Sequence, residues 1–296
     1  MNPSNTLSTL NTRNTMSTSN AMSTSNAMIR LLRIDRALLT GALLAIGAAA
    51  AGAQETREWK WSGQLGSGRT VYLRNINGQV RFEQGTGNTV EVVAEKRWRR
   101  GDPDDVRIEA RQAGTGNGDV IICALWGERA TCDESGYHGK NDRDGRWGRD
   151  NDVSVHFVVK IPASARVQAS TVNGGLVVDG TTADIEAETV NGDVDARSNG
   201  GRVQASTVNG SITVRTTAAN ADGLEYKTVN GSITIELPAS TNANVNLSTV
   251  NGRISSDFPL TLEGNINPRR IRAKLGEGGP TLRANTVNGS IRLRKL

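Results

Sequence analysis

The sequence predicts an all-β protein built as a repeat β-solenoid of short strands. The first observation is a phrase that returns along the chain, Thr-Val-Asn-Gly followed by one polar and one aliphatic residue. The second is its spacing: from Asn173 onward, successive Asn residues lie 18, 18, 21, 21 and 37 positions apart. Steps of 18 or 21 fit coils that each add about two short strands. An antiparallel β-sandwich or prism stays open as the alternative, because Asn-Gly is also the best short signal for a hairpin.

Composition supports many short strands, since the chain has 33 Gly and only 4% aromatic residues. We expect residues 1–27, which are rich in Ser, Thr and Asn, to be a disordered low-complexity leader, with Met28 as an alternative start. Residues 28–53 have the pattern of a secretory signal peptide: three arginines, an apolar run over 37–51, and small residues up to Ala53. The apolar run is too short for a membrane-spanning helix. Cleavage after Ala53 would remove it and leave the mature chain without a membrane-spanning segment.

No nucleic-acid partner is expected, because the charge of the chain is weak evidence for one. Without residues 1–53 the chain has 31 basic and 29 acidic residues, so much of its basic pI comes from the leader. A local asymmetry remains, with five basic and nine acidic residues over 166–252 but nine basic and three acidic over 253–296. The basic end is either a solvated cap or a contact surface for an anionic envelope polymer or lipid headgroup.

The two cysteines, Cys123 and Cys132, predict one intramolecular disulfide, because an exported chain matures where disulfides persist. A zinc site is not expected, since His138 and His156 are the only histidines and about four ligands are needed. No metal and no cofactor is therefore predicted.

The mature chain begins with an N-terminal β region over residues 54–165, whose apolar residues alternate with polar ones. Within it, residues 133–152 are expected to be a disordered, solvated insertion. Asp142 and Asp144 resemble part of a calcium loop, but no Glu stands at the closing position.

The β-repeat region over 166–296 is expected to continue directly from the preceding one. Seven Asn-Gly copies align so that apolar residues fall six, four and one before the Asn, and three and five after it; only Ser256 departs. The first two of these apolar positions share one phase of strand alternation, and the last three share the opposite phase. This switch predicts a bend near the Ser-Thr before the Val, with that Val pointing inward. Asn-Gly is expected to form a tight turn, because both residues tolerate positive φ. The predicted repeat-turn residues are Asn77, Gly78, Asn173, Gly174, Asn191, Gly192, Asn209, Gly210, Asn230, Gly231, Asn251, Gly252, Asn288 and Gly289.

Two further expectations concern the end of the chain. Residues 259–280 are interpreted as one degenerate coil without Asn-Gly, because Ile271, Ala273 and Leu275 alternate with polar residues. The basic final strand, residues 291–296, is expected to blunt the open edge of the solenoid.

The phrases Thr-Val-Asn-Gly-Ser-Ile at 207–212, 228–233 and 286–291 resemble a family of bacterial β-strand-repeat proteins of unknown function that carry an adhesin label. The segments 160–163 and 274–280 match it as well, and the resemblance covers about residues 66–296. It implies an exported or envelope-associated all-β repeat domain and supplies no catalytic residues. The Arg- and Asp-rich insertion over 139–152 and the leader depart from the family pattern.

No catalytic constellation stands out, so the sequence predicts a non-enzymatic protein of the cell envelope, in the periplasm, at the surface or secreted. Its partner would be an envelope glycan or protein, met by a polar surface of the repeats. One alternative is a carbohydrate-active enzyme on a β-helix scaffold, for which Asp179, Asp184, Asp193 and Asp195 are the candidate carboxylates. A structural or stress-sensing envelope protein is the other.

Overall fold

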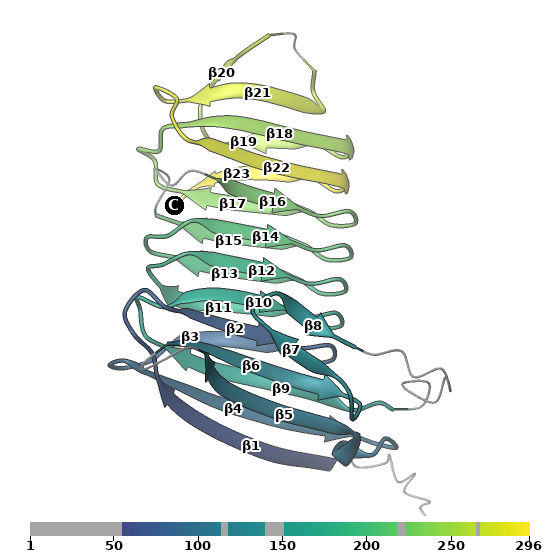
Figure 1. Ribbon diagram of the computed structural model, residues 1–296. Helices are drawn as coiled ribbons and strands as arrows, with labels where there is room; N and C mark the ends of the chain where they lie inside the picture. Colours follow the sequence, from purple (N-terminus) through teal and green to yellow (C-terminus); the bar gives the residue numbers. More distant parts are fainter. Residues whose placement is uncertain (1–54, 114–117, 140–150, 218–222, 265–266) are drawn as a thin grey trace, which may run out of the picture. The chain divides into compact units, whose positions relative to one another are not determined.

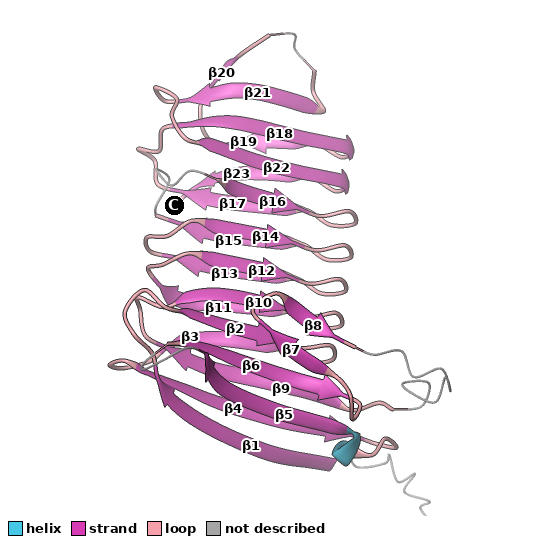
Figure 2. Cartoon of the chain, in the orientation of Figure 1, coloured by secondary structure: helices cyan, strands magenta, loops and turns pink. Residues whose placement is uncertain are grey.

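A computed structural model of the chain describes residues 55–113, 118–139, 151–217, 223–264 and 267–296. These residues form two long sheets and one small hairpin, joined by short loops (Figure 1; Figure 2). Residues 1–27 and 28–53, for which a leader and a signal peptide are predicted, lie outside the described ranges.

The strands of both sheets follow one another in space in an order that differs from their order in the chain. In spatial order, the ten-stranded sheet contains β1 (Glu55–Gln64), β4 (Thr89–Trp98), β9 (Ser154–Ile161), β3 (Val80–Gln84), β11 (Leu176–Thr181), β13 (Val194–Ser198), β15 (Ile212–Thr216), β17 (Ile233–Leu237), β23 (Ile291–Lys295) and β19 (Ile254–Ser256). The eleven-stranded sheet contains β20 (Leu260–Leu262), β21 (Arg270–Leu275), β18 (Ala243–Asn251), β22 (Thr281–Asn288), β16 (Leu224–Lys227), β14 (Val203–Ser206), β12 (Ile185–Glu188), β10 (Arg166–Ser170), β2 (Thr70–Arg74), β6 (Asp119–Trp126) and β5 (Val106–Ala113). The hairpin is β7 (Thr131–Asp133) with β8 (Gly136–His138), and a single helical turn, η1, covers Pro103–Asp105.

Each repeat adds one strand to each sheet. Along the stack the repeats pair in parallel and without offset, as in Val167 with Ile185 and Leu176 with Val194. The prediction of a β-solenoid is confirmed, and the antiparallel alternative is wrong for the repeats, because every ladder between Asn-Gly coils is parallel.

The core lies between the two sheets and is continuous along the stack. Residues six and four before each Asn, and three and five after it, point into it, as Val203, Ala205, Ile212 and Val214 do in one coil. Four of the five predicted apolar positions are thus inward. Ser256 departs because its strand, β19, is the last of the ten-stranded sheet and has a neighbour on one side only.

The order of coils in space differs from their order in the chain at both ends. The last repeat, β22 with β23, lies between the coil of β16 and β17 and the coil of β18 and β19. At the other end, β2 lies between β10 and β6, and β3 lies between β11 and β9, so β6 and β9 are farther from the repeats than β2 and β3. The basic strand over 291–296 therefore does not blunt an edge: β23 pairs with β17 on one side and β19 on the other.

The interpretation of residues 259–280 as a degenerate coil is also wrong. β21 runs antiparallel to β18, and β20 runs antiparallel to β21, so this segment extends only the eleven-stranded sheet. Ile271, Ala273 and Leu275 do alternate as a strand, and Ala273 and Leu275 are buried. Antiparallel strands at a stack end cover part of the parallel edge that would otherwise remain open.

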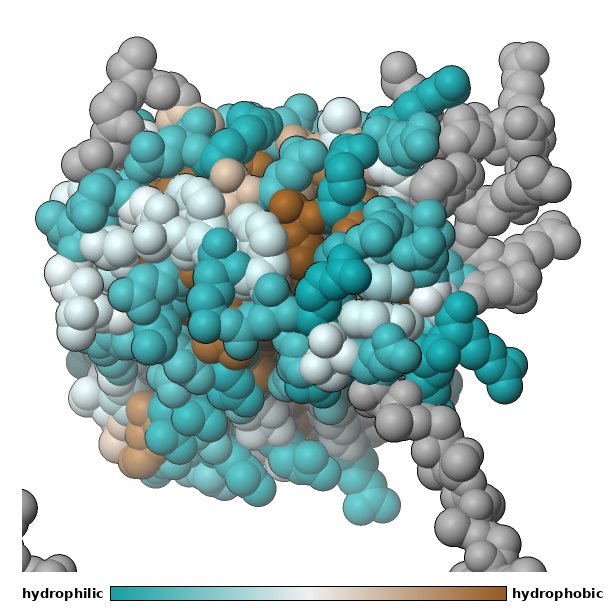
Figure 3. Space-filling model, turned by 90° about the horizontal axis from the view of Figure 1, so that it is seen from below, coloured by the Kyte–Doolittle hydropathy of each residue, from teal (hydrophilic) through white to brown (hydrophobic). Residues whose placement is uncertain are grey.

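The opposite end is closed by β1, β4 and β5. Trp59, Trp61 and Trp98 are partly buried there and pack on the core. Figure 3 shows this end as mostly hydrophilic, with a few hydrophobic atoms near its middle. The large aromatic side chains complete the core where no further coil follows.

Candidate functional site

Each Asn-Gly phrase forms the corner at which the chain passes from the eleven-stranded to the ten-stranded sheet. The Asn residues pair as bridges along the stack, and their side-chain amides form one ladder. Nδ2 of Asn191 donates to Oδ1 of Asn173 at 2.8 Å, and the same bond recurs through Asn209, Asn230 and Asn288 to Asn251 at 2.7–2.8 Å. Asn77 stands apart, since its Nδ2 donates to the carbonyl of Val153 at 3.3 Å.

The corner differs from its prediction in which side chain points inward. The Val before each Asn is exposed, by 37–54%, and these residues are Val172, Val190, Val208, Val229, Val250 and Val287. The Thr before that Val is buried instead, and these residues are Thr171, Thr189, Thr207, Thr228, Thr249 and Thr286. The Thr keeps the alternation of the strand before it, so the chain bends after the Thr rather than before it.

A hydrogen bond from the hydroxyl offsets the cost of burying the threonine inside the stack. Oγ1 of Thr207 donates to the carbonyl of Gly192 in the neighbouring coil at 3.0 Å, and Thr189 donates in the same way to Gly174 at 2.9 Å. Burying a hydroxyl costs little when it is paired in this way.

The corner glycines are needed for close approach between coils. A Cβ on Gly210 would lie 1.9 Å from the carbonyl oxygen of Gly192, and one on Gly231 would lie 1.9 Å from that of Gly210. Among the seven corner glycines only Gly78 has a left-handed φ, at 115°. Positive φ, the reason expected from sequence, therefore applies to one corner, and contact between stacked backbones explains the others.

We expect Asn209→Ala to lower the free energy of unfolding by about 1 kcal/mol, because it removes one donated and one accepted amide hydrogen bond. Asn251→Ala, at the end of the ladder, removes only the bond that Asn251 donates to Asn288 and should cost less. Denaturant midpoints of the two variants provide the comparison. A loss at Asn251 equal to or larger than that at Asn209 would show that the ladder does not stabilise the stack.

The hairpin of β7 and β8 lies on the outward face of the eleven-stranded sheet. Its Cys132 forms a disulfide with Cys123 of β6, with the two Cα atoms 6.3 Å apart. Around the disulfide, Ile121, Leu125 and Ala130 form a second, small apolar cluster, so β6 is buried on both faces. Residues 133–139 are thus ordered, contrary to the predicted disordered insertion, because they pack on this cluster; residues 140–150, with Asp142 and Asp144, lie outside the described ranges.

Reducing the disulfide should loosen the hairpin first. The closed loop separates its cysteines by nine positions, and loop-closure entropy predicts a contribution of about 2.5 kcal/mol. We expect the double variant Cys123→Ala with Cys132→Ala to speed amide hydrogen exchange in β7 and β8 while the exchange of β12–β15 stays unchanged. Equal acceleration in both regions would contradict the local role.

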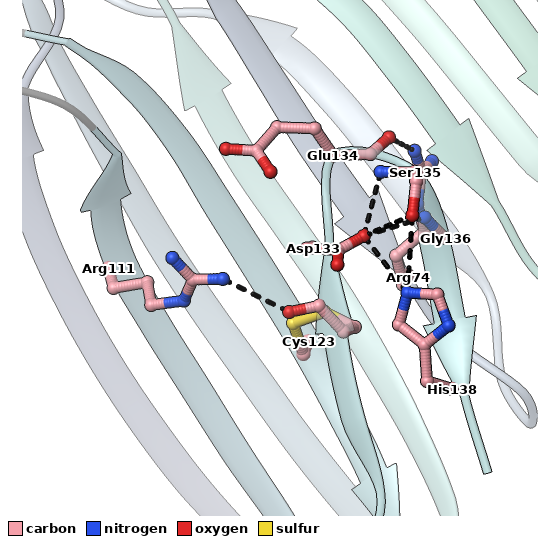
Figure 4. Close-up of polar contacts among 9 residues, drawn as sticks. Arg74, Arg111, Cys123, Asp133, Glu134, Ser135, Gly136 and His138 are labelled. Atoms are coloured by element: carbon pink, nitrogen blue, oxygen red, sulfur yellow. Dashed lines mark hydrogen bonds and ion pairs between the residues drawn. A yellow bond between two sulfur atoms is a disulfide. The ribbon is translucent and has the colours of Figure 1, made fainter.

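Asp133, Ser135 and His138 meet at the hairpin turn (Figure 4). Nε2 of His138 lies 3.0 Å from Oδ1 of Asp133 and 3.2 Å from Oγ of Ser135, and that hydroxyl also bonds Oδ1 of Asp133 at 2.6 Å. A catalytic triad requires the acid and the nucleophile at opposite ring nitrogens, whereas both contact the same one in this cluster. The hydroxyl of Ser135 and then the imidazole of His138 hold the pKa of Asp133 well below its usual range, so the cluster stabilises the turn.

Arg74 of β2 links the hairpin to the eleven-stranded sheet by hydrogen bonds. Its guanidinium donates to the carbonyl of Glu134 at 2.8 Å and to that of Gln168 at 3.2 Å. Burial lowers the pKa of Arg74, and the nearby carboxylates of Glu186 and Glu188 partly offset this effect. An arginine remains charged despite such a shift, because its ordinary pKa is so high.

The candidate glycosidase carboxylates each have a local partner. Arg197 bridges Asp179 and Asp195 at 3.5 Å from each. Oδ1 of Asp184 accepts the backbone N–H of Arg202 at 2.9 Å, and Oδ1 of Asp193 accepts that of Ser211 at 2.7 Å. The contacts of Asp179, Asp184 and Asp193 join neighbouring coils, whereas Asp195 meets Arg197 within β13, and all four are a structural use of the carboxylates.

The remaining candidate is the outward face of the eleven-stranded sheet, where the strand register aligns polar side chains in two rows, in parallel from β2 to β18 and antiparallel between β18 and β21. The first row contains Arg272, Asn246, Arg283, Glu225, Gln204, Glu186, Gln168 and Tyr72. The second row contains Arg270, Ser248, Asn285, Lys227, Ser206, Glu188, Ser170 and Arg74. Neighbouring residues in a row lie about 4.8 Å apart, the spacing of strands.

Two hollows mark this face. One, of about 620 Å³, lies over β21, β18 and β22. Its lining consists of Arg270, Arg272, Arg283, Asn246, Ser248 and Asn285, with the apolar Leu247 and Ile271. The other, of about 210 Å³, is lined by Glu186, Glu188 and Glu225 with Lys227 and neutral polar residues. The face is therefore basic at one end and acidic in its middle.

The sequence alone placed only part of this face. It marked the basic C-terminal segment, but Arg292, Arg294 and Lys295 lie on or beside the other sheet and do not join the basic hollow. Sequence reasoning counted Arg283 among the nine basic residues over 253–296 but did not single it out. The sequence does contain a signal for the hollow. Arg270 and Arg272 occupy the alternate positions of a strand whose other positions include the buried Ala273 and Leu275, so both arginines are expected on the outward face.

In the part of the chain that the structure describes, His, Cys, Asp and Glu side chains do not gather in threes as a metal site would need. No helix within the same ranges has the length and apolarity that a bilayer crossing requires.

Comparison with known proteins places the chain in a family. No curated protein matches it. Among solved structures, a candidate cell adhesion protein from Clostridium sporogenes is 11% identical, covering 82% of this chain and 100% of its own, with a TM-score of 0.47. A candidate adhesin from Bacteroides fragilis is 12% identical, covering 82% and 97%, with a TM-score of 0.36. The Toastrack DUF4097 family matches residues 69–294, and the chain belongs to that family.

Proposed function

We propose that this chain is an exported, non-enzymatic cell-envelope protein. Its repeat region would act as an adhesin-like scaffold that presents a polar surface to an envelope polymer or a partner protein. The outward face of the eleven-stranded sheet carries the proposal, because parallel register repeats its polar side chains at a fixed spacing across seven strands, from β2 to β18. A stack that buries one continuous core holds such a surface rigid, which lowers the entropic cost of binding an extended partner.

Two observations support export. The pattern of residues 28–53 is that of a secretory signal peptide. The disulfide between Cys123 and Cys132 suits an oxidising compartment, because thiols are kept reduced in the cytosol.

The enzyme alternative is less favoured by the geometry. Asp193 and Asp195 each contact a group of the scaffold, and the Asp133, Ser135 and His138 cluster has the wrong connectivity for a triad. Turnover of a polysaccharide that is abolished by Asp193→Asn or Asp195→Asn would overturn the non-enzymatic proposal.

The test of location and binding uses the full chain in its native cells. Fractionation with protease shaving should find a processed chain outside the cytoplasm, and the purified mature chain should be retained on envelope polymers extracted from the same cells. An unprocessed chain in the cytoplasm would refute export. Failure of every extracted polymer and envelope protein fraction to retain the chain would refute the binding role.

A further inference from the structure

The basic hollow at the end of the eleven-stranded sheet has the form of a binding site. In the first row, Asn246 lies between Arg272 on β21 and Arg283 on β22. In the second row, Ser248 lies between Arg270 and Asn285. Short polar side chains of β18 thus make the floor, and longer guanidinium side chains on the flanking strands rise beside it, which explains the hollow of about 620 Å³.

The three arginines carry uncompensated charge. Within the described ranges, no hydrogen bond or ion pair involves the guanidinium of Arg270, Arg272 or Arg283, and no acidic residue lines the hollow. Two carboxylates close to the hollow are engaged elsewhere. Glu225, which follows Arg283 in the first row, pairs with Lys227 at 2.8 Å. Glu263, whose N–H donates to the carbonyl of Arg272, pairs with Lys274 at 3.3 Å. By contrast, Arg215 on the other sheet pairs with Glu236 at 2.8 Å.

The lining chemistry selects the class of ligand. Guanidinium groups bind carboxylate and sulfate oxygens through paired N–H donors. The amides of Asn246 and Asn285 and the hydroxyl of Ser248 can bond sugar hydroxyls, because each offers donors and acceptors. No aromatic side chain lines the hollow to stack a nucleobase. Its two apolar residues, Leu247 and Ile271, pack on the core, so the hollow offers mainly polar groups and does not suit an acyl chain.

We propose that this hollow binds an acidic polysaccharide through its carboxylate or sulfate groups. The inference rests on the proposed function, since it names the envelope polymer that the scaffold holds. Arg270, Arg272 and Arg283 bind the acidic groups, and Asn246, Ser248 and Asn285 bind the sugar hydroxyls between them.

The acidic middle of the same face defines where the polymer lies. Glu186, Glu188 and Glu225 line the second hollow with one lysine, so a polyanion that follows the rows away from the basic end meets repulsion. The polymer is therefore confined to the strands β21, β18 and β22.

The experiment measures binding of the full mature chain to polygalacturonate and to dextran sulfate, with neutral dextran as the third ligand. The triple variant Arg270→Gln, Arg272→Gln and Arg283→Gln should weaken binding of at least one acidic polymer by about tenfold or more, as expected for loss of charged hydrogen bonds. The charge-matched control is Arg253→Gln, Arg292→Gln and Arg294→Gln, which lie at the same end of the stack but on the corner and strand of the other sheet. It should change the affinity by less than about twofold, because these side chains do not line the hollow.

Equal losses in the two triple variants would overturn the site, since net charge alone would then explain binding. Retention of neutral dextran as strong as that of the acidic polymers would overturn the ligand class. A second variant, Glu186→Gln with Glu188→Gln, keeps the hollow intact and should raise the affinity for the acidic polymers; an unchanged or lower affinity would contradict the confinement. If extracted envelope polymers retain the wild type and the triple variant of the hollow equally, this inference fails while the proposed function stands.

Discussion

Replacing Gly174 with alanine is expected to destabilise the stack by about 3 kcal/mol or more, at the upper end of the cost of overpacking. A Cβ on Gly174 would lie 2.1 Å from the carbonyl oxygen of Gly78 in the neighbouring coil. Relief of this clash requires the two coils to separate, which disturbs the hydrogen bond from the N–H of Gly78 to the carbonyl of Asn173 at 2.8 Å. The substitution therefore weakens the backbone ladder as well as the contact between coils.

The control is the adjacent residue. A Cβ on Gly175 would lie 3.3 Å from its nearest neighbour, the carbonyl oxygen of Asp193, and other coils carry Asp193, Ser211 or Ser232 at the equivalent position. Gly175→Ala should cost less than about 1 kcal/mol, the range of ordinary surface changes. Thermal and denaturant midpoints of the two variants decide the matter, and equal losses would show that close approach of the coils is not what requires glycine.

Placing an aspartate at Thr207 is expected to cost about 3 kcal/mol or more, because it buries a charge without a partner. Thr207 is 5% exposed, and its hydroxyl donates to the carbonyl of Gly192. A carboxylate cannot donate that bond, and its oxygens would face the carbonyl oxygen. The same change at Val208, which is 40% exposed, should cost about 1 kcal/mol or less.

The two aspartate variants test which side chain of the corner points inward. Their denaturant midpoints should differ clearly, with Val208→Asp close to the wild type. A larger loss at Val208 than at Thr207 would reverse the assignment. Because the corner repeats in every coil, the same ordering is expected for Thr189 and Val190.

Prediction of the corner from sequence failed for a specific reason. Thr and Val have nearly the same shape, and either one could end the inward series of the strand before the Asn. Apolarity favoured the Val, whereas strand alternation and the hydroxyl bond to a glycine carbonyl favour the Thr. That bond joins two coils, so it cannot be inferred from one repeat alone.

The basic hollow shows a similar limit. Its arginines stand at positions 270, 272 and 283, but they flank β18, whose residues Asn246 and Ser248 come earlier in the chain. This arrangement exists because the last coil of the chain, β22 with β23, lies between the coil of β16 and β17 and the coil of β18 and β19, and not at the end of the stack. All repeats offer nearly the same edge for pairing, so local sequence does not specify which two become neighbours.

By itself the sequence determined the repeat, the all-β solenoid and four of the five inward positions, because a period of two along strands and a constant step between coils are local properties. It also indicated the disulfide partners, since two cysteines allow one pairing. Only the tertiary structure decided the inward threonine, the need for glycine at the corners, the order of the end coils and the gathering of Arg270, Arg272 and Arg283. Each of these depends on contacts between coils, where the backbone of one repeat meets the side chains and carbonyl groups of the next.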